Sequence, residues 1–262
     1  MIKRILPAAV FAAVSLMGTS AHAAFAPFTV NEGVVAGAAA NVFTAGKLNG
    51  GFTEALTITG PNTFSASAFA NIGQYFDPLG ALQPSQVGPG LFGANNQYQI
   101  YAVFSATGTF AGNSFTGVTG SFDLYIDQSS NTVRNLANPF VGTAPVSLSN
   151  TGDDLLVGST TTLLSGVGEL DPTPPNAFDF IFDDLVLTAF GKTYFTAPNP
   201  FYLRVRVNGD TDGALLPPVG QTLLATGDVS AEFKVPEPTA LSLVGLALVG
   251  AGVASRRRAT KA

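Results

Sequence analysis

Apolar and polar residues alternate along several segments in the middle of the chain. Residues 201–208 alternate strictly, so that Leu203, Val205 and Val207 fall on one face and polar side chains fall on the other. A period of two residues is typical of a strand with one buried face and one solvated face. The same reasoning predicts strands over residues 52–59, 64–72, 98–110, 121–127, 155–164, 178–190 and 230–235.

These segments predict an all-β protein. Gly, Asn, Pro and Asp separate about eight to ten strands at short spacing, and no segment shows the period of an amphipathic helix. We therefore expect a β-sandwich or jelly roll. The proline-rich residues 171–175 form either a surface loop or a boundary between two halves. We favour a single domain over residues 24–235, because the strands on both sides of that stretch have the same pattern.

The first residues have the pattern of a secretory signal peptide. Lys3 and Arg4 precede an apolar run over residues 5–17, and the segment ends in Ala21-His22-Ala23. A charged start, a short apolar core and small residues at the exit predict cleavage between Ala23 and Ala24. A membrane anchor or a buried helix is the alternative, and the short apolar core disfavours it. We expect residues 1–23 to be removed.

Removal of this segment leaves a chain without histidine or cysteine, because His22 is the single histidine and there is no cysteine. Catalytic triads that use an imidazole base are therefore excluded, as are the usual zinc, haem and iron–sulfur sites. A disulfide framework is excluded as well. Carboxylate chemistry and oxygen-ligated calcium remain. We expect no enzymatic activity, with a secreted hydrolase that uses an Asp/Glu pair as the alternative.

The last residues carry a second targeting pattern. Pro236, Glu237 and Pro238 precede an apolar stretch over residues 240–254, which is followed by three consecutive arginines, Arg256, Arg257 and Arg258. As a helix, the stretch is about 22 Å long and, with its flanking residues, reaches the lower limit for spanning a bilayer. The arginines favour a cytoplasmic position, which leaves the body of the chain outside.

This tripartite ending resembles the PEP-CTERM sorting signal. The resemblance implies an exported chain that uses the general secretion machinery and passes through an inner-membrane intermediate. An exosortase then processes the tail, residues 236–262, near the Pro-Glu-Pro motif. The expected destination is the cell surface or extracellular matrix of a Gram-negative bacterium that makes exopolysaccharide. Residues 24–32 are similar to the start of flocculation-associated PEP-CTERM proteins, which implies a role in cell aggregation or biofilm formation with exopolysaccharide as partner.

The body between the two targeting segments is acidic. Residues 24–235 contain six lysines and arginines against sixteen aspartates and glutamates. No basic stripe is available to neutralise phosphates, so nucleic acid is not an expected partner. Multivalent cations, cationic polymers and neutral glycans fit this charge better.

One segment has the start of a calcium-binding loop. Asn208, Asp210 and Asp212 place oxygen ligands at the first, third and fifth positions, and Gly213 follows. An EF-hand carries a carboxylate at its twelfth position, where this chain has Val219. The alternative is a turn that closes a hairpin after the preceding strand. We expect no obligate cofactor and consider calcium the ion that this segment could bind.

Other candidate groups have simpler alternatives. Asp153-Asp154, Asp179 and Asp183-Asp184 are the densest acidic clusters and the candidates for a hydrolase, but adjacent residues of a strand point to opposite faces. Tyr101 and Tyr125 could stack on sugar rings, although cross-strand pairing explains such tyrosines better.

Overall fold

The computed structural model describes residues 27–88, 97–135, 146–169, 177–199, 201, 203–210 and 218–233. Phe25–Lys234 form one compact unit, separate from the two terminal segments. The predicted signal peptide and sorting tail, including the cleavage residues and the C-terminal arginines, lie outside the described residues. Among the residues that are described, no helix has the length and apolar character needed to cross a membrane.

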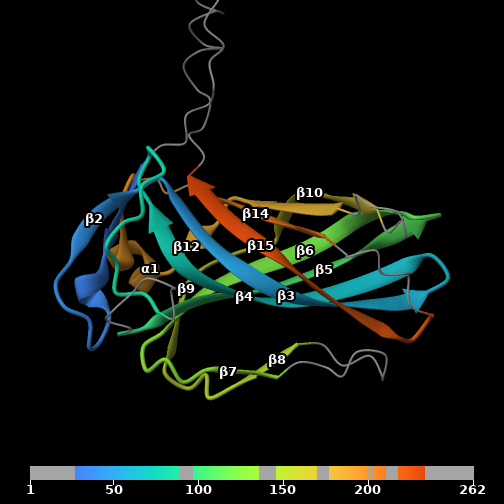
Figure 1. Ribbon diagram of the computed structural model, residues 1–262, viewed down its shortest axis with the longest axis horizontal. Helices are drawn as coiled ribbons and strands as arrows, with labels where there is room; N and C mark the ends of the chain where they lie inside the picture. The colour runs from blue at the N-terminus through green and yellow to red at the C-terminus, as the bar shows by residue number, and fades with distance from the viewer. Residues whose placement is uncertain are drawn as a thin grey trace, which may run out of the picture. The chain divides into compact units, whose positions relative to one another are not determined.

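Long antiparallel strands make up most of this unit (Figure 1). The main sheet contains β3 (Lys47–Gly60), β4 (Thr63–Phe76), β5 (Gln99–Ala111), β6 (Ser114–Asp127), β10 (Thr162–Glu169), β11 (Ala177–Asp183), β14 (Leu203–Asp210) and β15 (Thr222–Phe233). Their order is β10-β11-β14-β15-β3-β4-β5-β6.

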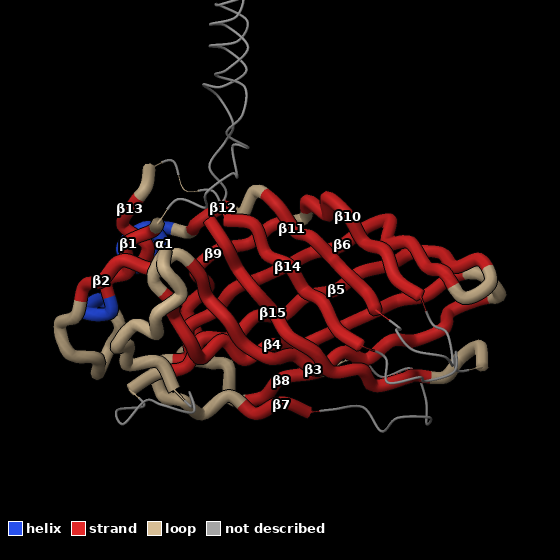
Figure 2. The backbone as a smooth tube through the Cα atoms, turned by 45° about the horizontal axis from the view of Figure 1, so that its top comes forward, coloured by secondary structure: helices blue, strands red, loops and turns tan. Residues whose placement is uncertain are grey.

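The sheet closes on itself because β10 also pairs with β6, with Val167 opposite Thr116. Figure 2 shows these strands side by side around the unit. The all-β class is confirmed, but the strands form a closed eight-stranded barrel, and the two facing sheets of a sandwich or jelly roll are not seen. Because β6 and β10 pair with each other, neither strand has the unpaired edge here that it would have in a sandwich.

Glycines in β10 explain why the barrel can close at this position. A Cβ on Gly168 would lie 2.1 Å from Cζ of Phe115, and a Cβ on Gly166 would lie 2.8 Å from Cδ1 of Phe180. Both distances are shorter than carbon atoms tolerate. The aromatic rings of the neighbouring strands therefore occupy the space that side chains of β10 would need.

Aromatic side chains fill the barrel. Phe52 of β3 contacts Phe104 of β5 and Phe178 of β11 edge to face, with ring centroids 5.6 and 5.7 Å apart. The alternate apolar residues within 203–207 are at most 1% exposed, which confirms the inward face predicted for that strand.

An acidic side chain also points into this aromatic interior. Glu54 lies two residues after Phe52 on β3, is 4% exposed, and lies opposite Ala68 of β4. Its Oε2 atom has no hydrogen-bond partner in the described part of the chain. Burial raises the pKa of Glu54 to about 8, because the ionised carboxylate would lose its hydration. The carboxyl is therefore protonated inside the folded barrel at neutral pH.

A smaller group of elements lies at one end of the barrel (Figure 1). It consists of β1 (Phe28–Asn31), a 3-10 turn (Glu32–Val34), β2 (Val42–Ala45), α1 (Ala189–Tyr194) and β13 (Phe195–Ala197). The strand predicted over residues 178–190 is divided into β11, β12 (Val186–Leu187) and the start of α1. The strand ends there because the Thr188 side chain caps the helix by accepting a hydrogen bond from the Gly191 amide at 3.0 Å.

A buried hydrogen-bond network fastens this group to the barrel. Glu32 is fully buried and accepts hydrogen bonds from the Tyr98 hydroxyl and the Gln86 amide, both at 2.8 Å. The Tyr98 hydroxyl is 2.7 Å from that of Tyr194, which in turn is 2.8 Å from that of Tyr75. Satisfying a buried carboxylate in this way fixes one arrangement of the surrounding strands.

The remaining strands lie beside and outside the barrel. They are β7 (Val133–Asn135), β8 (Ser147–Ser149) and β9 (Asp154–Thr160), which pairs with β6. The β7–β8 hairpin lies against the outer face of β3 and β4, where Arg134 donates to Thr53 Oγ1 at 3.3 Å and the Val146 amide donates to Ser67 Oγ at 2.9 Å.

Candidate functional site

Three aspartates meet where β6 ends and β9 begins. Asp127, Asp153 and Asp154 each offer a carboxylate oxygen, and these oxygens lie within 4.8 Å of one another. The register of the sheet creates this cluster, because Asp127 of β6 pairs with Asp154 of β9. Two chain segments that are distant in the sequence therefore contribute to one acidic site.

Asp127 is held by the loop that follows it. Its side chain is fully buried and accepts hydrogen bonds from the Ser129 amide at 3.1 Å and the Thr132 amide at 2.9 Å. Backbone donors of this kind stabilise an ionised carboxylate without a metal. The Asp127 carboxylate thus organises the loop between β6 and β7.

Asp154 is bound by two hydroxyl groups. Tyr101 and Thr132 both donate to its carboxylate, the latter at 3.0 Å. Burial raises the pKa of Asp154, and the two hydrogen bonds oppose this change. Burial and the neighbouring carboxylate also raise the pKa of the Tyr101 hydroxyl, which therefore remains a donor.

Asp153 is the member of the cluster with an unsatisfied oxygen. Its Oδ2 atom is buried and has no hydrogen-bond partner in the described ranges, and the same is true of Ser130 Oγ. A hydrogen bond from the Ser129 side chain is the main cause that lowers the pKa of Asp153, and a weaker hydrogen bond from the Asn131 side chain acts in the same direction. The carboxylate is therefore ionised at neutral pH.

The cluster has the donor chemistry of a hard-cation site, since calcium binds six to eight oxygen atoms. All three carboxylates already have hydrogen-bond donors of the protein, so the same arrangement also serves to fasten the loops together. The sequence identified Asp153 and Asp154 as an acidic pair but missed Asp127. The polar loop that follows Asp127, at the end of a predicted strand, is the sequence signal that could have identified Asp127 as a member of the site.

The residues predicted for calcium lie elsewhere. Asn208 and Asp210 are on β14, where they pair with Asp228 and Thr226 of β15, and Asp212 lies outside the described residues. The strand thus continues through Asp210. Calcium binding by these three residues stays a prediction.

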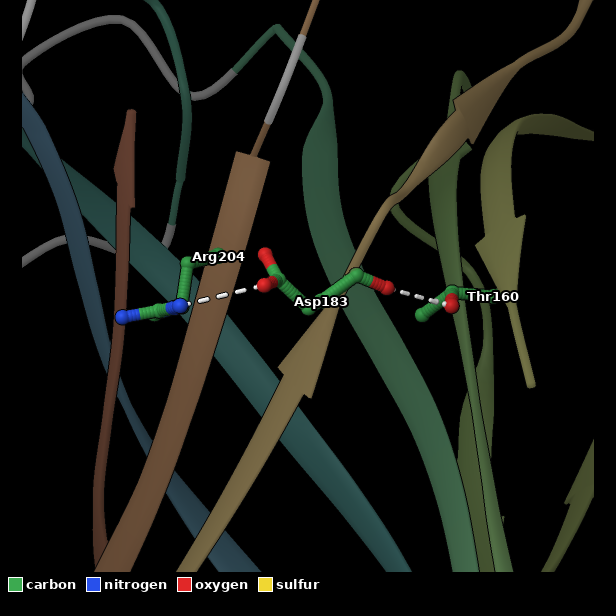
Figure 3. Close-up of polar contacts among 3 residues, drawn as sticks. All are labelled: Thr160, Asp183 and Arg204. Carbon is green, nitrogen blue, oxygen red and sulfur yellow. Dashed lines mark hydrogen bonds and ion pairs between the residues drawn. The ribbon is translucent and has the colours of Figure 1, made fainter. Parts of the chain in front are cut away.

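Two of the candidate hydrolase carboxylates bind arginines. The Asp183 carboxylate accepts from Arg204 at 3.0 Å, and its backbone carbonyl accepts from the Thr160 hydroxyl at 2.6 Å (Figure 3). Asp179 accepts two hydrogen bonds from Arg206, at 2.7 and 2.9 Å. Each carboxylate pairs across the β11–β14 ladder.

The predicted tyrosines pair across strands. Tyr101 and Tyr125 lie opposite each other and stack with ring centroids 5.1 Å apart, and Phe69 stacks on the other side of Tyr101. Tyr101 is only 2% exposed. Its ring is therefore covered, and cross-strand pairing accounts for it.

An open groove of about 870 Å³ runs over the outer wall of the barrel. It crosses β6, β10, β11, β14 and β15 and is lined by Asp179, Arg206, Asn208 and Asp228, among others. The predicted calcium ligand Asn208 therefore lies in a surface groove that sequence reasoning did not foresee.

Comparison with known families finds the PEP-CTERM protein-sorting motif at residues 234–258. No curated protein and no solved structure matches the chain. The match covers the Pro-Glu-Pro residues, the apolar stretch and the arginines from which the resemblance was inferred. The chain therefore carries a PEP-CTERM sorting signal and is an exported exosortase substrate of the cell surface or extracellular space in Gram-negative bacteria.

Proposed function

We propose that this chain is a non-enzymatic protein of the cell surface or matrix that promotes flocculation and biofilm aggregation with exopolysaccharide. The sorting motif at residues 234–258 carries the proposal, because it directs the chain to the cell surface or extracellular space, where secreted exopolysaccharide would be within reach. The similarity of residues 24–32 to flocculation-associated proteins of this type supports the same role.

The charge of the chain supports a mechanism based on many weak contacts. Residues 24–235 carry sixteen acidic and six basic side chains. Copies of such a protein, present together on cells and in the matrix, would bind polysaccharide directly and through divalent cations. Linked weak contacts of this kind give strong overall attachment without one strong site.

The ion pairs of the barrel wall support a non-enzymatic role. A glycosidase needs two carboxyl groups about 5–10 Å apart that are free to act as acid and as base or nucleophile. Asp179 and Asp183 are instead engaged by Arg206 and Arg204. These carboxylates are therefore better suited to holding β11 against β14 than to cleaving a sugar.

Deletion of the gene tests the proposed function. The settling rate of the cells is measured together with the amount of secreted exopolysaccharide, and a strain with the gene restored is the control. Dispersed cells that still secrete exopolysaccharide are the expected result. Unchanged settling in the deletion strain would refute the role in aggregation.

A further inference from the structure

The groove on the outer wall contains a continuous row of side chains that cross five strands. Thr116 of β6 lies opposite Val167 of β10, which lies opposite Asp179 of β11. The row continues through Asn208 of β14 to Asp228 of β15. Laterally aligned residues of neighbouring strands point to the same face of a sheet, so these side chains form one line along the groove.

The chemistry of the row favours a ligand rich in hydroxyl groups. Asn208 offers an amide that both donates and accepts, Asp228 offers a carboxylate that accepts, and Thr116 offers a hydroxyl. All three residues are exposed, and neither Asn208 nor Asp228 makes a side-chain hydrogen bond to another described residue. Their hydrogen-bonding groups are therefore available to a ligand at the surface.

The charges of the groove disfavour an anionic ligand. Asp228 and Glu169 bring negative charge to its lining, so a polyanion such as nucleic acid or a polyuronate would be repelled. The positive charge of Arg206 is already directed at Asp179 by two hydrogen bonds. The pair presents little net charge, and the rest of the lining includes the uncharged polar residues Ser114, Thr116, Asn208 and Thr226.

The form of the groove favours a long ligand. An open channel over five strands gives many shallow contacts, whereas small ligands usually bind in enclosed, mostly apolar cavities. The β10, β14 and β15 strands carry Gly168, Gly209 and Gly227 in the lining. Their missing side chains would point toward the interior rings of Phe52, Phe115 and Phe178, so these glycines contribute only backbone to the groove.

We propose that this groove binds an extended segment of a neutral polysaccharide, with Asn208 and Asp228 hydrogen-bonding to its hydroxyl groups. The inference deepens the proposed function and rests on it, because it assigns the contact with exopolysaccharide to one face of the barrel. The Asn208 and Asp228 side chains would bind neighbouring hydroxyls, and Val167, farther along the same row, would contact the apolar face of a sugar ring.

Affinity electrophoresis of the exported protein provides the test. Native gels contain dextran or galactomannan as neutral probes, glycol chitosan as a cationic probe, or alginate as an anionic probe. The test variant combines Asn208→Ala with Asp228→Ala. The control variant combines Asn71→Ala with Asp123→Ala, which makes the same chemical changes at positions that do not line the groove. Thermal unfolding of each variant confirms that the barrel is intact.

The expected result is retardation by at least one neutral polysaccharide. The loss of two or more hydrogen bonds should raise its dissociation constant about tenfold in the test variant and leave the control variant unchanged. Retardation only by the charged probes, no retardation by either neutral probe, or equal behaviour of the two variants would overturn the assignment.

The same variants separate this inference from the proposed function. If deletion of the gene disperses the cells but the Asn208→Ala/Asp228→Ala strain settles like the wild type, the groove assignment fails and the aggregation role stands. If deletion leaves settling unchanged while the variant loses binding to a neutral polysaccharide, the aggregation role fails and the groove assignment stands.

Discussion

The buried carboxyl of Glu54 makes the stability of the barrel depend on pH. Glu54 is 4% exposed among aromatic side chains, and burial raises its pKa to about 8 from an ordinary value of 4.5. We expect the substitution Glu54→Gln to remove this dependence, because glutamine has the same shape and carries no charge at any pH. The two proteins are compared by urea unfolding between pH 5 and pH 9.

The sign and size of the effect follow from proton linkage. Below the unfolded pKa, both states are protonated and no ionisation penalty exists. As the pH rises from about 4.5 to 8, the unfolded chain releases its proton first, so the wild type loses about 1.4 kcal/mol of stability per pH unit from this group. Above pH 8 the folded carboxyl also ionises, and the loss levels off at about 5 kcal/mol.

We therefore expect Glu54→Gln to be within about 1 kcal/mol of the wild type at pH 5 and about 3 kcal/mol more stable at pH 7. Subtracting one stability curve from the other cancels all groups that the proteins share. Asp228→Asn, which changes an exposed carboxyl, is the matched control and should keep the pH dependence of the wild type. A constant difference between Glu54→Gln and the wild type from pH 5 to pH 9 would refute the reasoning.

Three further results are expected. Chelation of divalent cations should weaken flocs, and flocs that settle equally fast with a chelator would remove cations from the mechanism. Gly168→Ala should lower the melting temperature, because its Cβ would lie 2.1 Å from Cζ of Phe115. Gly152→Ala is the control, because the Cβ there meets open space, and it should leave the melting temperature unchanged. Equal melting temperatures of the two variants would contradict this account of barrel closure. Tyr98→Phe should lower the free energy of unfolding by about 1–3 kcal/mol, because it removes the hydroxyl that donates to Glu32, and an unchanged value in chemical denaturation would show that the network contributes no stability.

The strands could be predicted from the sequence because their alternation is local. The apolar residues within 203–207 and 121–127 have the period of a half-buried strand, and the structure places both segments in the barrel wall. The closure of the barrel could not be predicted in the same way. It depends on a pairing between β6 and β10, and hence on whether Gly168 and Phe115 meet across the wall.

The polar sites show the same difference between local and distant information. Asp153 and Asp154 are adjacent, so the sequence identified them, whereas Asp127 joins them only through the register of β6 with β9. Asp183 was likewise identified only as part of an acidic pair with Asp184, and its ion pair with Arg204 arises only through the pairing of β11 with β14. Side chains that meet through strand pairing require the register, which a period of two residues does not specify.

The measurement that tests the central claim most directly is the addition of purified protein to cells. Cells that lack the gene are washed, and the exported protein is added with or without deproteinised exopolysaccharide from the same strain. If the protein links cells through the polysaccharide, settling returns when both are present and not when either is added alone. Recovery without polysaccharide, or no recovery when both are added, would contradict the account.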